Sequence, residues 1–329
     1  MDLEFKSKLL KAIDSAPDDK RLAEYLLKVS KYLNPTRYVD STITMQDSIK
    51  KLMDDIAPRF TIELKNKQVG SLSEFYYLTS GLHVIGAPSG HGKTFWAMKW
   101  AEDAAKQDNE VLVLSLEMNH SDLASRTISE ITDLPLIKIV RRDLNQTQKI
   151  LIKDLADSDE YKYFKKIHID TFGDYDWVKI YPRLIDRMVR LKPKLVIIDY
   201  VQMISNSETD DLRSSKILND IARELKLFAD QTDAAVLLLS QLNREAIKEI
   251  KSSKLNRVEF IPLSHDNIKE SGGIVEAADS VQMVCIPGRL DLCPDHLKNT
   301  FQVSITKSRR IGLLGTKLFP FDYKTMKFI

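Results

Sequence analysis

The segment Gly86–Thr94, which reads Gly-Ala-Pro-Ser-Gly-His-Gly-Lys-Thr, constrains the fold more than any other part of the 329-residue chain. Residues 82–85 before it form an apolar run that predicts a buried strand, and the apolar residues from Phe95 onward predict a helix. A strand, a glycine-rich turn, Gly-Lys-Thr and a helix in this order are typical of a phosphate-binding loop. The segment therefore predicts a nucleotide site in an α/β fold.

The chemistry of phosphate binding explains the residue types in this loop. Small residues let backbone N–H groups approach a phosphate, and the following helix directs its positive end at the same anion. Lys93 would add a charge for the terminal phosphates, and Thr94 a hydroxyl for Mg²⁺. Ala87 stands where the strict motif has its first glycine, with Gly86 one residue too early. The predicted nucleotide-binding residues of the loop are Ala87, Pro88, Ser89, Gly90, His91, Gly92, Lys93 and Thr94.

The composition excludes few functions. Lys and Arg total 49 against 47 Asp and Glu, so the net charge argues neither for nor against nucleic acid. Cys285 and Cys293 are the two cysteines and provide no metal or disulfide framework. The first 30 residues lack the apolar core of a signal peptide, and no apolar run has membrane-spanning length. We therefore expect no membrane association and a cytoplasmic protein, or one of the host-cell cytoplasm if a phage encodes it.

From residue 82 the chain alternates between apolar strands and helices. Strands that are apolar throughout and alternate with helices predict a mainly parallel sheet covered on both faces. After residue 260 the pattern changes to shorter strands, which we expect to be antiparallel at the sheet edge. The first set of predicted strands is 82–85, 111–116, 167–170, 195–200 and 234–240, and the later set is 281–286, 301–305 and 317–321. The helices predicted between the first strands are 95–107, 122–132, 145–157, 176–191 and 213–232.

The region before the loop predicts a separate helical part. Residues 1–39 have apolar residues at helical spacing but are too few for a large core. Residues 40–78 combine an amphipathic helix at 40–57 with a linker. We expect the ATPase domain to occupy residues 79–329.

Nucleotide hydrolysis requires carboxylates at the strand ends beside the loop. Asp199 follows the apolar run 195–198 and is the expected Mg²⁺ ligand, together with Thr94. An acidic helix cap is the alternative interpretation of Asp199. Glu117 ends the second strand and could polarise the attacking water, but Asp170 ends the third strand and competes for this role on position.

Two further groups complete the predicted site. Gln241 follows the fifth strand, where an amide could sense the terminal phosphate and move a loop after hydrolysis. The basic cluster 307–310 lies far from the loop in the sequence and could supply an arginine to a neighbouring subunit. A surface glutamine and a solvated basic patch are the respective alternatives.

From Thr79 to the C-terminus, these motifs resemble the RecA-like motor domain of the DnaB-family hexameric replicative helicases. That family commonly has alanine at the first loop position, as Ala87 is here. The matching segments are 79–82, Ser115-Leu116-Glu117-Met118, Ile198-Asp199-Tyr200-Val201-Gln202, Ser240-Gln241-Leu242-Asn243-Arg244, Lys269-Glu270-Ser271-Gly272 and Lys307-Ser308-Arg309. The resemblance implies a RecA-like P-loop NTPase fold preceded by a small helical region.

The resemblance also implies roles for single residues. It identifies Glu117 as the catalytic base in preference to Asp170, with Lys93 and Gln241 as further catalytic residues. Arg309 would be the arginine finger, and Lys307 would contact the neighbour's nucleotide beside it. Because Gly312 follows at a wider spacing than usual, Arg310 remains an alternative finger.

DNA contacts are expected in two loops. Lys269, Glu270 and Gly272 match a loop that contacts single-stranded DNA, although lysine replaces the usual arginine and loses its bidentate fork. The polar stretch 205–213 is a second candidate, with Arg213 as its best phosphate contact and a surface loop as the alternative interpretation. Backbone N–H groups and lysine charge bind phosphates without reading bases.

The function implied is an ATP- and Mg²⁺-dependent helicase that translocates 5′ to 3′ on single-stranded DNA as a homo-oligomer, expected to be a hexamer. A separate primase and a helicase loader are further expected partners. The short N-terminal region predicts a compact replication system, such as that of a phage. A RecA-like recombinase and a non-motor, ATP-dependent partner-binding ring are the two alternatives, which filament formation and an absence of DNA-stimulated ATPase, respectively, would favour.

Overall fold

The computed structural model describes residues 45–46 and 60–329, apart from 172, 174, 206–213, 244–257, 269–271, 292, 310–311 and 324. The chain divides into two compact units. One comprises Met1–Phe60 and Tyr181–Lys192, and the other comprises Thr61–Ile180 and Pro193–Ile329, which carries the phosphate-binding loop. The helical region predicted at 1–39 lies outside the described residues, as does the helix predicted at 40–57 except for Met45 and Gln46.

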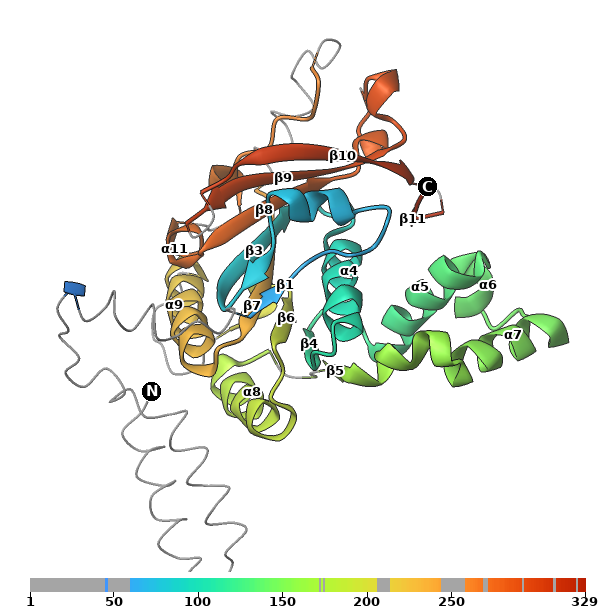
Figure 1. Ribbon diagram of the computed structural model, residues 1–329, viewed down its shortest axis with the longest axis horizontal. Helices are drawn as coiled ribbons and strands as arrows, with labels where there is room; N and C mark the ends of the chain where they lie inside the picture. The colour runs from blue at the N-terminus through green and yellow to red at the C-terminus, as the bar shows by residue number, and fades with distance from the viewer. Residues whose placement is uncertain are drawn as a thin grey trace, which may run out of the picture. The chain divides into compact units, whose positions relative to one another are not determined.

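A nine-stranded sheet forms the centre of the second unit, as far as the structure describes it (Figure 1). Its strand order is β11-β10-β9-β8-β3-β7-β6-β4-β5. The strands are β3 Gly81–Ala87, β4 Val111–Ser115, β5 Ile167–Thr171, β6 Leu195–Asp199, β7 Ala235–Gln241, β8 Ser280–Cys285, β9 Thr300–Ser308, β10 Gly315–Asp322 and β11 Lys327–Phe328. The strands from β8 to β5 in this order are all parallel, so their carboxyl ends form one edge.

Helices cover the sheet, with α4 and α9 on different sides of it in Figure 1. The α-helices are α4 Lys93–Lys106, α5 His120–Thr132, α6 Leu136–Val140, α7 Gln146–Asp157, α8 Trp177–Leu191, α9 Ser214–Thr232 and α11 Gly272–Ala277. Four of the five helices predicted from periodicity begin within two residues of α5, α7, α8 and α9, whereas α6 was not predicted. No helix in the described part of the chain has the length and apolar character needed to cross a membrane.

One predicted strand orientation was wrong. The segment 281–286 was expected to be antiparallel at the edge, but β8 pairs in parallel with β3 and lies between β3 and β9. The reason is the long connection from β7: Leu242 N–H donates to Ala87 O at the carboxyl end of β3, and Asp279 N–H donates to Leu82 O near its start. The chain therefore returns to the opposite sheet edge before β8 begins. Strands β9 and β10 are antiparallel, as predicted.

Trp96 and Trp100 on α4 lie in the core, as the sequence indicated. Both side chains are fully buried, and both indole N–H groups donate to Gln282 Oε1, at 2.8 and 3.1 Å. One buried amide on β8 therefore satisfies both polar atoms of α4 that burial would otherwise leave unpaired.

Residues 61–78 pack onto the same unit. The short strands β1 (Thr61–Ile62) and β2 (Leu78–Thr79) pair antiparallel, and Asp103 on α4 accepts from the backbone N–H groups of Lys65 and Asn66. The domain boundary at residue 79 stays a prediction.

A buried ion network joins α4 to α5. Lys99 Nζ lies 2.6 Å from Glu130 Oε1 and 3.1 Å from Glu102 Oε2, and the Lys99 side chain is 5% exposed. Burial raises the pKa of Glu130, and the charge of Lys99 opposes this rise. The lysine therefore compensates two carboxylates that are largely removed from water.

We expect Lys99→Met to lower the free energy of unfolding by about 3–5 kcal/mol, because it leaves buried carboxylates without their cation. Denaturant unfolding measures this change. Lys106→Met on the same helix is the control, since Lys106 is exposed and contacts the Tyr163 ring at 4.7 Å, an interaction of about 0.5–1 kcal/mol. Equal losses in the two variants would contradict the network's role.

Candidate active site

The phosphate-binding loop has the geometry of an anion site. Gly92 adopts a φ of 82°, and a Cβ there would lie 2.8 Å from Phe301 Cε2, so only glycine fits. Among the described residues, no side chain caps the first turn of α4, and that turn contains no acid. The N–H groups at its start are therefore left for an external acceptor. Ser89 and Gly90 are exposed, whereas Ala87 and Pro88 are buried.

Asp199 lies against the loop. Thr94 Oγ1 donates to its Oδ2 at 2.6 Å, and Lys93 Nζ is 3.6 Å from its Oδ1. Asp199 is 1% exposed, and its Oδ1 accepts no hydrogen bond from the described residues. A buried carboxylate oxygen in this state costs free energy unless a cation completes it. The structure thus brings together the two predicted Mg²⁺ ligands and the loop lysine.

Glu117 lies beside this centre, and Asp170 lies farther away. The backbone N–H groups of Leu116 and Glu117 both point to Asp199 O, at 2.7 and 3.3 Å, and the Glu117 side chain is exposed. Asp170 is 8% exposed within β5, which is separated from β3 by β7, β6 and β4. Position on the sheet therefore favours Glu117 as the residue that meets water near the loop.

Tyr200 connects the acidic groups to Gln241. Its ring lies 4.4 Å from Lys93 Nζ, and its hydroxyl is hydrogen-bonded to the Gln241 side chain. Burial raises the Tyr200 pKa, and the nearby charges of Glu117 and Asp199 raise it further. The phenol therefore stays neutral at physiological pH. All five groups gather at the carboxyl ends of neighbouring strands.

The backbone around Gln241 is braced from two directions. Gln202 Nε2 donates to Ser240 Oγ at 2.6 Å, and the Gln241 N–H donates to Gln202 Oε1 at 3.3 Å. On the far side, Asn243 N–H donates to Asn267 O at 2.8 Å, just before residues 269–271. The strand end that carries Gln241 is thus joined to the segment that leads into the predicted DNA loop.

His91 and Arg289 hold the loop from the side of β8. His91 is 8% exposed, and its Nδ1 accepts from the Ile286 N–H at 3.3 Å. Arg289 donates from Nη1 to Gly90 O and from Nη2 to Met326 Sδ. The His91 imidazole is therefore turned toward β8, which leaves its backbone as the part expected to bind phosphate.

Lys307 and Arg309 lie at the opposite edge of the sheet. Arg309 N–H donates to Asp279 O, and Asp279 N–H donates to Leu82 O, so Arg309 is level with the start of β3. Five residues separate Leu82 from Ala87, which is about 16 Å of strand. The two cations therefore do not join the loop of their own chain. Arg310 lies outside the described residues.

The predicted DNA contacts are described only in part. Gly272 begins α11, with open space around it, whereas Lys269, Glu270 and Arg213 lie outside the described residues. Their assignment stays a prediction. Within the described ranges, no group of three or more His, Cys, Asp or Glu side chains could hold a metal ion by itself.

Sequence reasoning did not single out Tyr200, Gln202 or Arg289. Tyr200 and Gln202 stood inside a quoted motif but were given no role, and Arg289 follows β8 with no motif around it. All three act through contacts to residues distant in the sequence, which local patterns do not report.

Comparison with known proteins agrees with this geometry. Residues 75–329 match the family model described as DnaB-like helicase C-terminal domain. A replicative DNA helicase DnaB of Helicobacter pylori is 32% identical over 259 residues, which cover 73% of this chain and 49% of the relative. A probable plasmid replicative DNA helicase of Chlamydia trachomatis is 27% identical over 251 residues, with 74% and 49% coverage. The chain thus spans about half the length of these relatives.

Two solved structures share the fold. One is an isolated ATPase domain, which superposes with a TM-score of 0.70 at 22% identity, with 88% of this chain and 99% of the other chain covered. The second is a DnaB-like replicative helicase, studied with its interactions with primase, which has a TM-score of 0.69 at 20% identity, with 99% and 75% coverage. The RecA-like fold expected from the sequence is therefore confirmed, and the chain belongs to the DnaB-like helicase C-terminal domain family.

Proposed function

We propose that this protein is an ATP-driven DNA helicase whose active sites form between subunits of a ring. The observation that carries the proposal is the division of the site between two sheet edges. Lys93, Thr94, Asp199 and Glu117 gather at one edge, whereas Lys307 and Arg309 lie at the other. A second subunit is needed to bring both sets to one nucleotide, and a head-to-tail interface of this kind closes into a ring.

The residues present fit Mg²⁺ and ATP. Asp199 Oδ1 is buried without a hydrogen-bond partner among the described residues, and Asp199 Oδ2 already accepts from Thr94. Carboxylate and hydroxyl oxygens beside a phosphate site are typical Mg²⁺ ligands. Bound there, Mg²⁺ would neutralise charge that develops on the terminal phosphate oxygens. The open N–H groups of the loop and the charge of Lys93 would bind the β- and γ-phosphates.

The protein's own groups then divide the reaction. Glu117 takes the proton from the attacking water at its carboxylate, and Lys93 stays on the phosphates. The Gln241 amide bonds the γ-phosphate and loses that bond after hydrolysis. Because Gln241 precedes Asn243, which bonds Asn267, this change reaches the segment before residues 269–271. Arg309 and Lys307 of the neighbouring subunit stabilise the phosphate charge in the transition state.

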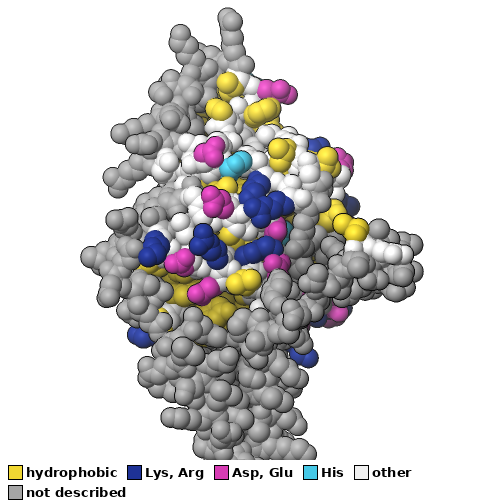
Figure 2. All heavy atoms as spheres, turned by 90° about the vertical axis from the view of Figure 1, so that its left-hand side faces the viewer, with side chains coloured by type: hydrophobic (Ala, Val, Ile, Leu, Met, Phe, Trp, Pro, Cys, Tyr) yellow, Lys and Arg dark blue, Asp and Glu magenta, His cyan; other side chains and the backbone are white. Residues whose placement is uncertain are grey.

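DNA is the proposed substrate on which the motor acts. The relatives are named as replicative DNA helicases. The face that carries α9 and α11 presents gathered Lys and Arg side chains, with Asp and Glu side chains among them (Figure 2). Such a mixed basic surface suits contact with phosphates without base recognition. A hexameric ring, 5′-to-3′ movement, a primase partner and a loader belong to the same proposal.

The ATPase rate with and without single-stranded DNA tests the proposal, together with mass by light scattering in ATP and Mg²⁺. We expect DNA to stimulate turnover of a six-subunit species. Filaments on DNA would instead indicate a recombinase. An oligomer whose ATPase ignores DNA would indicate a partner-binding ring and would refute the motor.

A further inference from the structure

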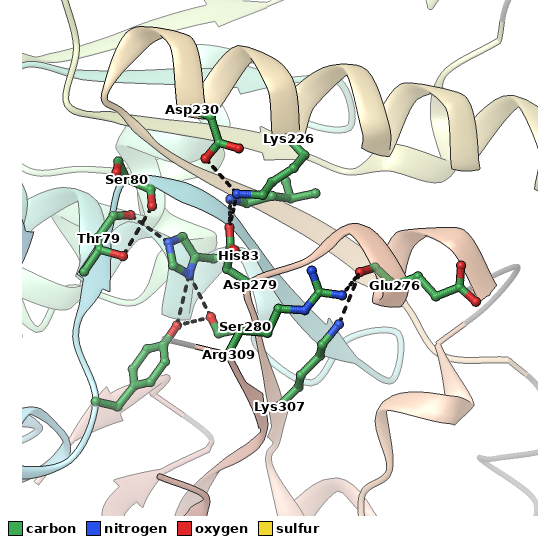
Figure 3. A network of polar contacts seen from close by, with 12 residues as sticks. Thr79, Ser80, His83, Lys226, Asp230, Glu276, Asp279, Ser280, Lys307 and Arg309 are labelled. Carbon is green, nitrogen blue, oxygen red and sulfur yellow. Dashed lines mark hydrogen bonds and ion pairs between the residues drawn. The ribbon is translucent and has the colours of Figure 1, made fainter. Parts of the chain in front are cut away.

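Lys307 and Arg309 end on the helix that follows the predicted DNA loop. Arg309 Nη2 donates to Glu276 O at 2.6 Å, and Lys307 Nζ donates to Val275 O and to Glu276 O (Figure 3). These carbonyls belong to the last turn of α11, which has no later N–H group of its own helix to bond. The end of a helix carries partial negative charge, so it attracts both cations. The orientation of α11 therefore sets the direction of both side chains.

The other end of α11 adjoins residues 269–271 and is fixed to α9 by a single side chain. Gly273 N–H donates to Asn219 Oδ1 at 3.0 Å. The approach is close, since a Cβ at position 273 would overlap the Asn219 side chain. Six residues, about 9 Å of helix, separate the two ends. A displacement at the loop therefore reaches Val275 and Glu276 through one rigid turn and a half.

The residue that follows this helix is held firmly. Asp279 Oδ2 accepts from the Leu82 N–H at 2.9 Å and lies 2.8 Å from Lys226 Nζ, which also contacts Asp230 (Figure 3). The adjacent Ser280 hydroxyl bonds His83 Nδ1 at 2.7 Å. With its exit fixed to β3 and α9, α11 can respond to its loop end by turning about Asp279. Such a turn re-aims the two carbonyls without moving the strand that carries Lys307 and Arg309.

We propose that Asn219 is a positioning residue which, through α11, couples DNA contact at residues 269–272 to the presentation of Lys307 and Arg309 to the neighbouring subunit. The inference rests on the proposed function. It adds a path by which DNA bound to one subunit regulates hydrolysis in the next, separate from the path through Gln241 to the subunit's own nucleotide.

Asn219→Ala removes the acceptor and tests the coupling. At saturating single-stranded DNA we expect the stimulation of the ATPase to fall about five-fold or more. The rate without DNA and the KM for ATP should stay at wild-type values, because Asn219 touches neither site. Asn219→Asp keeps an oxygen acceptor and should retain the stimulation. Asp220→Ala is the control on the same helix, since the Asp220 carboxylate pairs with Arg223 at 3.8 Å. Full stimulation in Asn219→Ala would overturn the inference.

Mixed rings locate the effect on the neighbour. Subunits with Glu117→Gln contribute Lys307 and Arg309 to a wild-type neighbour but do not hydrolyse ATP themselves. We expect added Glu117→Gln/Asn219→Ala subunits to lower the DNA stimulation of wild-type subunits more than added Glu117→Gln subunits do. Equal lowering would mean that Asn219 acts only within its own subunit and would overturn the inference.

If the wild type shows no DNA stimulation, the proposed motor function fails, and hydrogen exchange then decides the inference. An ATP analogue that draws Lys307 and Arg309 to the neighbour should change amide exchange across residues 273–278 in the wild type. The same analogue should leave that segment unchanged in Lys307→Ala/Arg309→Ala. Identical exchange in both proteins would overturn the coupling through α11.

Discussion

Glu117→Gln is expected to lower the ATPase rate by about 10²–10⁴-fold, the contribution of a positioned general base. The Glu117 carboxylate is exposed beside Asp199 O, where water has access to the loop. Glutamine has nearly the same shape but cannot accept the proton. ATP affinity should stay equal or rise, because the change removes a negative charge near the triphosphate. Single-turnover hydrolysis and nucleotide titration measure the two quantities separately.

Asp170→Asn is the matched variant, because it neutralises the carboxylate that competed for the role on sequence position. Asp170 lies within β5, the strand farthest from β3 on this side of the sheet, and is 8% exposed. We expect turnover close to that of the wild type. Loss of hydrolysis in Asp170→Asn together with normal turnover in Glu117→Gln would reassign the base.

The contrast between these two carboxylates shows what the sequence contains. Both follow apolar strands, and strand position alone left both as candidates. The order of the strands decides between them, and this order depends on pairings such as Ser115 with Asp199. Such pairings join residues more than 80 positions apart and leave no local pattern. The resemblance to a known family supplied the preference that local chemistry could not.

The loop and the strands around it could be predicted because their determinants are local. Glycine spacing and apolar runs specify β3, the turn and α4 within about 25 residues. The orientation of β8 could not be predicted in this way. A strand pairs in parallel or antiparallel according to where the preceding connection returns, and here the connection spans residues 242–279. Its apolar pattern is the same in either orientation.

The supporting contacts of the site were also invisible in the sequence. Tyr200 meets Lys93 and Gln241, and Gln202 meets Ser240. These pairs are brought together by the sheet, not by spacing. Polar residues at such positions are common on protein surfaces, so only the fold distinguishes a braced side chain from a solvated one.

Arg309→Ala is expected to lower the ATPase rate by about 10³–10⁵-fold, the range for an arginine that completes phosphoryl transfer. The loss should occur although the substitution leaves the chain's own loop intact, because Arg309 lies at the opposite sheet edge. Arg309 is exposed and ends on a backbone carbonyl, so its removal should leave the fold stable. Steady-state turnover and thermal unfolding measure the two effects.

Mixing two inactive proteins distinguishes action on a neighbour from action within one chain. Arg309→Ala subunits keep Glu117, and Glu117→Gln subunits keep Arg309, so a site between them contains both groups. With random assembly in a head-to-tail ring, about one quarter of the sites combine the intact halves. We therefore expect activity to return on mixing, whereas either protein alone stays inactive. If Arg310→Ala gives this pattern and Arg309→Ala does not, the finger is Arg310. No recovery in any mixture would mean that the cations act within their own chain, and a site shared between subunits would be excluded.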